Sequence, residues 1–166
     1  MNINDFLSRN DAMVETRVLD KVQLLGELSR RAAASLQLAP DLVADAVLKR
    51  EELGSTGMGS GVAIPHARFR DLRKPFGLLA RLRKPIDFEA VDGRPVDIVF
   101  LVVAPESDPL NALACVARKL RDPQVMADLR KAKRQRGSLR GRQRRASRLI
   151  RRSRMSLRAK QRYTTI

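Results

Sequence analysis

Charge is segregated along this chain, and the segregation limits how much of the chain can fold around a hydrophobic core. Residues 1–128 contain all 18 acidic residues and 18 of the 34 basic ones, so their formal charges cancel. The other 16 basic residues lie in 129–166, with no acidic residue and few large apolar ones among them. Such a stretch cannot bury enough apolar surface to offset the entropy of ordering it. The sequence therefore predicts one folded domain over residues 1–130 and a basic, disordered tail over residues 131–166.

The size and composition of the chain favour a single cytoplasmic domain. Its 166 residues leave room for one sizeable core, and a hydrophobic content of 43% is ordinary for a globular protein. No apolar stretch approaches the roughly 20 residues of a membrane span, and residues 1–5 lack the basic start of a signal peptide. The single cysteine, Cys115, has apolar neighbours on a predicted helix, so we expect it in the core and not in a redox site.

Hydrophobic periodicity in residues 1–128 predicts alternating strands and helices. Strands are predicted over residues 13–18, 62–64, 76–82 and 96–103, and helices after Asp20, Pro40, Pro105 and Asp122. The inward faces expected on the first two helices comprise Val22, Leu25, Leu28 and Ala32, then Leu42, Val43, Ala46 and Val47, with Gly54 ending the second helix. Because 96–103 is almost wholly apolar, we expect it to be a central strand. The predicted fold class is α/β, with helices covering a mixed β-sheet.

The only histidine, His66, follows a glycine-rich loop and a short apolar run. Four glycines within residues 54–61 allow the backbone to approach a ligand closely, and the apolar run 62–64 places Pro65 and His66 at the end of a strand. An imidazole can be a neutral nucleophile near pH 7. Loop amides together with nearby hydroxyls can face an anion such as phosphate; the hydroxyls are those of Ser55, Thr56 and Ser60.

The order Gly61-Val-Ala-Ile-Pro-His66-Ala67 resembles the signature of enzyme IIA domains of the fructose/mannitol type in the bacterial phosphotransferase system. In that signature a glycine-rich loop and a small apolar run precede Pro-His-Gly/Ala. The likeness covers residues 1–130, and the nitrogen-regulatory branch is the most similar. Outside the signature it is carried by Arg50-Glu-Glu-Leu-Gly-Ser-Thr-Gly57, Pro85-Ile-Asp-Phe88 and Val91-Asp-Gly-Arg-Pro-Val-Asp-Ile98.

This resemblance implies reversible phosphoryl transfer onto His66, with a small histidine phosphocarrier protein as the donor. Negative charge then spreads over three equatorial oxygens in the transition state. Hydrogen-bond donors must therefore already be in place beside those oxygens. The resemblance favours Arg50 as the charged partner, although Arg68 lies only two residues from His66. The expected phosphate-binding residues are Ser55, Thr56, Gly57, Ser60 and Gly61.

Each of these assignments also has a purely structural interpretation. A lone histidine is commonly a surface or core residue, and a glycine-rich segment can be a flexible connection. Arg50 late in a helix also favours the helix dipole, and the loop serines and threonine suit turns. One histidine and one distant cysteine cannot form a usual zinc site, and no Gly-Lys-Ser/Thr follows the glycines. We therefore predict no metal and no cofactor, with the phosphoryl group supplied by a protein.

The chain departs from the family pattern before its third main helix. The family commonly has a second histidine there, in a pattern like His-Leu-x-x-Leu-Ala, whereas this chain reads Pro109-Leu110-Asn-Ala-Leu113-Ala114. A proline side chain cannot form a hydrogen bond, and the nearby Asn111 does not match the position. We therefore expect slower transfer onto His66 or a less stable phosphorylated form.

The arginine-rich tail is the second departure. One hypothesis is that this segment is translated out of frame, since shifted high-GC coding sequence often yields arginine, serine and alanine. Reading the gene in its neighbouring frames tests this, because one of them should restore a helical ending of mixed charge. The alternative is a genuine tail that binds nucleic acid or acidic lipid. Its single aromatic residue, Tyr163, gives little support for base stacking.

Three functions are consistent with these features. The one we favour is a regulatory phosphocarrier whose phosphorylation state controls docking to target proteins. The second is a sugar-transport enzyme IIA that passes the phosphoryl group to a IIB domain; it needs the same histidine. The third is non-specific nucleic-acid binding through the tail, which removal of the residues after 133 would abolish while phosphorylation persisted.

Overall fold

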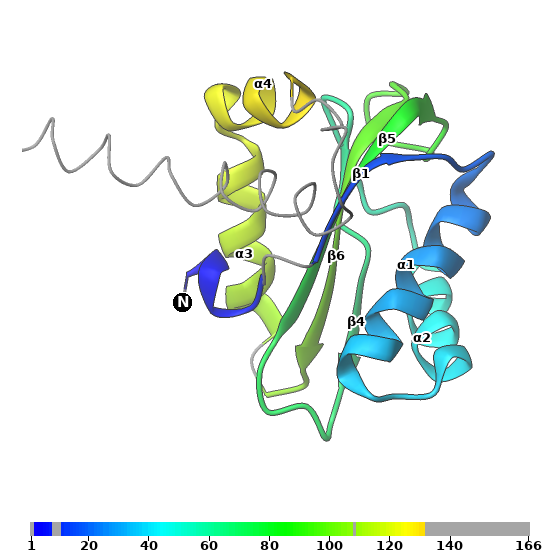
Figure 1. Cartoon of the computed structure of the whole chain (residues 1–166), viewed down its shortest axis with the longest axis vertical. Helices are drawn as coiled ribbons and strands as arrows, with labels where there is room; N and C mark the ends of the chain where they lie inside the picture. The colour runs from blue at the N-terminus through cyan, green and yellow to red at the C-terminus, as the bar shows by residue number, and fades with distance from the viewer. Residues whose placement is uncertain (1, 8–10, 108, 132–166) are drawn as a thin grey trace, which may run out of the picture.

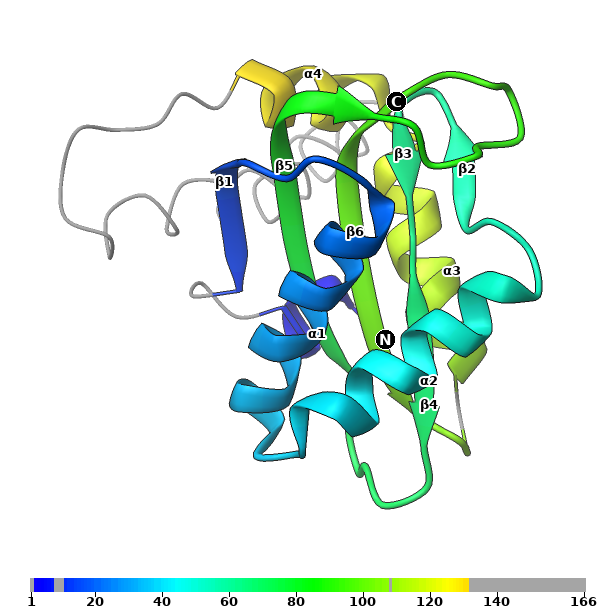
Figure 2. The ribbon, with the colours of Figure 1, turned by 90° about the vertical axis from the view of Figure 1, so that its right-hand side faces the viewer.

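The computed structural model describes residues 2–7, 11–107 and 109–131, so the predicted tail lies outside the described residues apart from Lys131. These residues form a six-stranded mixed sheet with helices on both faces, which confirms the predicted fold class (Figures 1 and 2). The strands are β1 (Ala12–Thr16), β2 (Gly57–Gly59), β3 (Val62–Ala63), β4 (His66–Phe69), β5 (Phe76–Ile86) and β6 (Val96–Pro105). The helices are the 3₁₀ turn η1 (Ile3–Asp5), α1 (Lys21–Leu36), α2 (Pro40–Glu52), α3 (Pro109–Leu120) and α4 (Pro123–Lys131).

Strand β6 lies in the middle of the sheet, as its apolar sequence predicts. The strand order is β1-β5-β6-β3-β2, and β4 also pairs with β6. β5 runs antiparallel to β6, whereas β3 and β4 run parallel to it one after the other. Val62 therefore lies opposite Ile98, and His66 lies opposite Val102. The motif that contains His66 is thus held along one side of the most buried strand.

Alternate residues of β6 face two separate halves of the core. Ile98, Phe100 and Val102 pack in the half that contains η1, α3 and α4, where the Phe6 and Phe100 rings meet edge to face at 6.5 Å. Val99, Leu101 and Val103 pack in the half covered by α1 and α2. Figure 1 shows these two helical layers on opposite sides of the sheet. Cys115 of α3 is buried in the first half, as expected.

Helices α1 and α2 start where the sequence predicts, but their buried stripes are narrower. The Asp20 side chain accepts a hydrogen bond from the amide of Gln23 at the start of α1, and Pro40 opens α2. Val22 and Leu42 were expected to face inward, yet they are 67% and 52% exposed. Each lies in the first turn of its helix, at the margin of the stripe. The remaining predicted large apolar residues, Leu25, Leu28, Val43 and Val47, are buried.

Strand β5 continues four residues beyond its predicted end at residue 82. Its register against β6 shifts between Arg81 and Ile86, and Ile86 then pairs with Val96. This irregularity admits Pro85, which cannot donate to a regular ladder. Within the described residues, no helix is both long and apolar enough to cross a membrane.

Ser29 gives a test of the packing between α1 and the sheet. Its side chain is fully buried and its hydroxyl has no hydrogen-bond partner in the described structure. An unpaired buried hydroxyl is costly, so Ser29→Ala should raise the free energy of unfolding by about 1 kcal/mol, measured by urea denaturation. Ser35→Ala, on the exposed side of the same helix, is the control for helix propensity. An equal gain in both variants would contradict the prediction.

Candidate functional site

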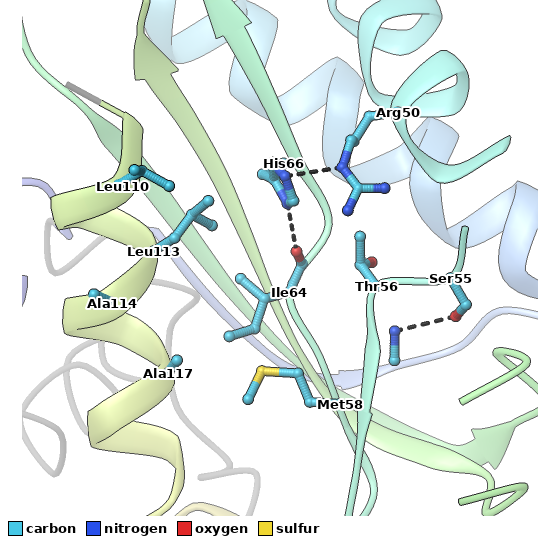
Figure 3. Close-up of a pocket in the computed structure, with 11 residues that line it drawn as sticks. Arg50, Ser55, Thr56, Met58, Ile64, His66, Leu110, Leu113, Ala114 and Ala117 are labelled. Atoms are coloured by element: carbon cyan, nitrogen blue, oxygen red, sulfur yellow. Dashed lines mark hydrogen bonds between the residues drawn. The ribbon is translucent and has the colours of Figure 1, made fainter. Parts of the chain in front are cut away.

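The His66 ring is held through both of its nitrogens. Nε2 lies 3.0 Å from Nε of Arg50, and Nδ1 lies 3.0 Å from the carbonyl oxygen of Ile64 (Figure 3). A guanidinium has only donors, so Nε2 must present a lone pair to it. The proton of a neutral ring is then on Nδ1, which donates to the Ile64 carbonyl. The geometry thus defines one tautomer, with Nε2 as the nucleophilic nitrogen.

The surroundings of His66 favour its neutral form. Burial lowers the pKa of His66 below its usual value of 6.5, and the positive charges of Arg50 and Arg68 lower it further. The Ile64 carbonyl and the negative charge of Glu51 act in the opposite direction without reversing the shift. The ring therefore keeps its lone pair at pH 7. Arg68 acts through its charge, whereas Arg50 contacts the ring directly.

Arg50 is fixed on two sides at the end of α2. Its Nε donates to His66, and its Nη1 donates to the carbonyl of Gly54 at 3.0 Å. Because the helix ends at Glu52 and Gly54 turns the chain with a φ of 144°, that carbonyl can reach back to the guanidinium. The arginine predicted from the sequence and the histidine are thus in direct contact.

Two of the loop hydroxyls predicted to bind phosphate, those of Ser55 and Thr56, donate their hydrogens within the protein. The Ser55 hydroxyl donates to the Phe88 carbonyl at 2.6 Å and accepts from the amide of Gly57. The Thr56 hydroxyl donates to Glu51 at 2.6 Å, and the Thr56 amide donates to the other oxygen of the same carboxylate. Ser55, Thr56 and Gly57 lie beside the cavity near His66, but these hydrogen bonds hold the shape of the loop.

Ser60 and Gly61, also predicted to bind phosphate, lie away from the cavity. They form the turn of the β2–β3 hairpin, where the Ser60 amide donates to Asp92 and the Ser60 carbonyl accepts from Arg130. The structure therefore does not bring these two residues into the lining of the cavity beside His66. The segment folds as a β-hairpin whose turn contacts Asp92 and Arg130.

The glycines serve that hairpin. A Cβ on Gly57 would lie 2.7 Å from the backbone of Ala90, so no side chain fits there. Gly61 has a φ of +79°, and a Cβ on it would lie 2.7 Å from Asp97. Close packing and positive φ thus account for these glycines.

A cavity of about 420 Å³ opens beside His66, with α3 as one wall (Figure 3). Most of its lining is apolar, and Arg50 is the one cationic residue among the described residues that line it. The α3 wall and Met58 were missed from the sequence, because their helical and strand periodicity is that of ordinary core residues. The lining comprises Arg50, Ser55, Thr56, Gly57, Met58, Ile64, His66, Leu110, Leu113, Ala114 and Ala117.

The fold and the site define an α/β protein built around one neutral histidine that is paired with an arginine beside an apolar cavity. Residues 5–137 match the family described as phosphoenolpyruvate-dependent sugar phosphotransferase system, EIIA 2. The chain belongs to this family, which confirms the resemblance seen in its sequence. IIA domains of this system carry phosphoryl groups.

Comparison with individual relatives indicates which branch of the family this chain resembles. The chain is 46% identical over 133 residues to a nitrogen regulatory protein of Bradyrhizobium diazoefficiens, covering 78% of this chain and 87% of that protein. It is 35% identical over 136 residues to the nitrogen regulatory protein of Escherichia coli K12, covering 80% and 83%. A crystal structure of nitrogen regulatory protein IIA-Ntr from Neisseria meningitidis matches 85% of this chain and 98% of that one, with a TM-score of 0.72 and 29% identity. The mannitol IIA of Escherichia coli shares the fold, with a TM-score of 0.68, 16% identity and coverage of 86% and 97%.

Replacement of Arg50 should raise the pKa of His66. Arg50→Met removes a positive charge and a donor to Nε2, both of which favour the neutral ring. The pKa should therefore move up toward 6.5, as measured by an NMR titration of the imidazole protons. Lys49→Met removes the same charge from the neighbouring exposed residue and should leave the titration nearly unchanged. Equal shifts in the two variants would show that the direct contact has no effect.

Proposed function

We propose that this chain is a cytoplasmic regulatory phosphocarrier, which accepts a phosphoryl group on Nε2 of His66 from a histidine phosphocarrier protein. The observation that carries the proposal is the contact between a neutral, lone-pair-bearing Nε2 and the Nε of Arg50 beside an open cavity. Regulation is favoured over sugar transport because the relatives described above are named nitrogen regulatory proteins. The phosphorylation state would then control binding to target proteins.

The proposed transfer exchanges one nitrogen–phosphorus bond for another. The Nε2 lone pair of His66 attacks phosphorus, and the bond to the donor's histidine nitrogen breaks with its electron pair left on the donor. His66 keeps the proton on Nδ1, where the Ile64 carbonyl supports the positive charge that grows on the ring. The Arg50 Nε–H loses its acceptor when Nε2 binds phosphorus, and from the same position it can donate to a phosphoryl oxygen and offset its charge.

The loss of the family's second histidine should slow this transfer. Pro109 opens α3 at that position, and Leu110 and Leu113 of the same helix line the cavity. Arg50 is then left as the one cationic residue among the described lining residues to meet charge spread over three oxygens. We propose a working nucleophile with weaker stabilisation of its transition state.

The apolar wall of the cavity supports docking of the donor protein. Leu110 is 70% exposed at the entrance, and Leu113, Ala114 and Ala117 continue the wall along α3. An exposed apolar surface beside a reactive group is typical of a protein–protein contact. A protein donor also explains why the cavity needs little polar lining.

Phosphorylation of His66 is tested by intact-mass spectrometry at alkaline pH, which protects an acid-labile phosphoramidate. With a reconstituted donor chain, the protein should gain about 80 daltons, the mass of one phosphoryl group, and His66→Ala should gain nothing. Arg50→Gln should react about a hundredfold more slowly, because it loses a charged donor to the transition state. No gain in folded wild-type protein would overturn the proposed function. Offering a IIB domain as acceptor then separates sugar transport from regulation.

Docking through the α3 wall predicts a charge-sensitive binding surface. Leu110→Asp should raise the donor concentration needed for half-maximal phosphorylation by about tenfold, since it puts a charge on an apolar contact. Leu42→Asp is the matched control, because Leu42 is also an exposed leucine but lies at the opposite end of α2 from Arg50. Phosphorylation rates at increasing donor concentration give the comparison. Equal behaviour of the two variants would place docking elsewhere.

A further inference from the structure

Glu51, the neighbour of Arg50, is a buried carboxylate that the proposed transfer does not use. It is 7% exposed, and both of its oxygens have partners. Oε1 accepts from the Thr56 amide at 2.8 Å and lies 3.0 Å from Nζ of Lys21, and Oε2 accepts from the Thr56 hydroxyl at 2.6 Å. A buried carboxylate is expensive unless it is paired in this way. The free-energy cost of burying Glu51 suggests that it has a role in this structure, and its partners indicate what that role is.

Lys21 connects Glu51 to two further parts of the fold. It opens α1, and its Nζ lies 2.7 Å from Glu89 and 4.9 Å from the centre of the Phe88 ring. Burial lowers the pKa of Lys21, but its bonds to Glu89 and Glu51 outweigh that effect and raise it. The ammonium group therefore stays charged and holds Glu51 in place. The start of α1 and the end of α2 meet at this ion pair.

The loop after α2 is consequently held at two successive residues. Glu51 holds Thr56 through its amide and hydroxyl, and the Phe88 carbonyl holds the Ser55 hydroxyl. Gly54, immediately before them, supplies the carbonyl that accepts from Arg50 Nη1. A fixed loop therefore fixes the acceptor that directs the guanidinium toward His66.

We propose that Glu51 is a positioning residue for phosphoryl transfer, acting through the loop 54–56 to hold Arg50 against Nε2 of His66. The inference rests on the proposed function of His66. Glu51 does not line the cavity and forms no described hydrogen bond to the ring; its charge acts on His66 from a distance, whereas the positioning effect passes through Thr56, Gly54 and Arg50. If Glu51 only stabilised the fold, its replacement would lower the unfolding temperature and leave the Arg50–His66 contact intact.

The test compares Glu51→Gln with Glu52→Gln in the full chain. Both remove one negative charge from the end of α2, but Glu52 is exposed and Glu51 is buried. In Glu51→Gln the phosphorylation rate should fall by about tenfold to a hundredfold, the cost expected of a misplaced catalytic group. By NMR, the Arg50 Nε–H should also exchange faster with water. Glu52→Gln should match the wild type in both measurements.

A second pair of variants isolates the hydroxyl of Thr56. Thr56→Val removes the donor to Glu51 and should reproduce both effects in a milder form, whereas Thr56→Ser keeps the hydroxyl and should show smaller effects than Thr56→Val. If Glu51→Gln or Thr56→Val folds and keeps both the wild-type rate and slow Arg50 exchange, the positioning role is overturned. If the wild type takes no phosphoryl group, the proposed function fails, while the exchange data still decide whether Glu51 positions Arg50.

Discussion

Strand β6 is buried on both of its faces, and this burial determines where the helices and the His66 strand can lie. A strand without a solvent-facing side needs cover from two layers, which α1 and α2 provide on one face and η1, α3 and α4 on the other. β4 runs parallel to β6, so His66 is placed by backbone pairing opposite Val102. The same strand separates α2 from α3. The cavity beside His66 can therefore take its cation from one layer and its apolar wall from the other.

The site combines a desolvated ring with a charge that is already in position. Burial lowers the pKa of His66, and the guanidinium of Arg50, which lies beside Nε2, lowers it further. A donor aligned before the reaction costs no reorganisation when charge develops, and it acts more strongly where apolar surroundings exclude water. In the proposed transfer, Arg50 would thus favour the neutral ring first and offset the phosphoryl charge afterwards. Because the Gly54 carbonyl restrains Arg50, both effects can come from one position of the guanidinium.

The sequence was most informative where function and fold are both local. Arg50 and His66 lie 16 residues apart, and the family resemblance rather than periodicity favoured Arg50 as the partner of His66, a contact that the structure shows. The bonds of the loop hydroxyls could not be predicted, because their acceptors include the distant Phe88 carbonyl. The position of Ser60 could not be predicted for a similar reason, since its backbone bonds are to the distant Asp92 and Arg130. Which margin of a helix is exposed likewise depends on neighbours that local periodicity does not identify, as the exposed Val22 and Leu42 illustrate.

A largely apolar cavity with one cationic residue in its described lining makes the proposed phosphoryl group a large perturbation. A phosphoryl group carries a charge of roughly −1.5 to −2 near neutral pH, which one guanidinium cannot fully balance. The surface around His66 would therefore change from apolar and weakly cationic to anionic when the ring is phosphorylated. A partner that docks on Leu110 and Leu113 would have to desolvate that charge, and a partner with its own cations would gain from it. The contrast between these two states requires no rearrangement of the backbone, so under the proposed function one site would both accept the group and report it to a target.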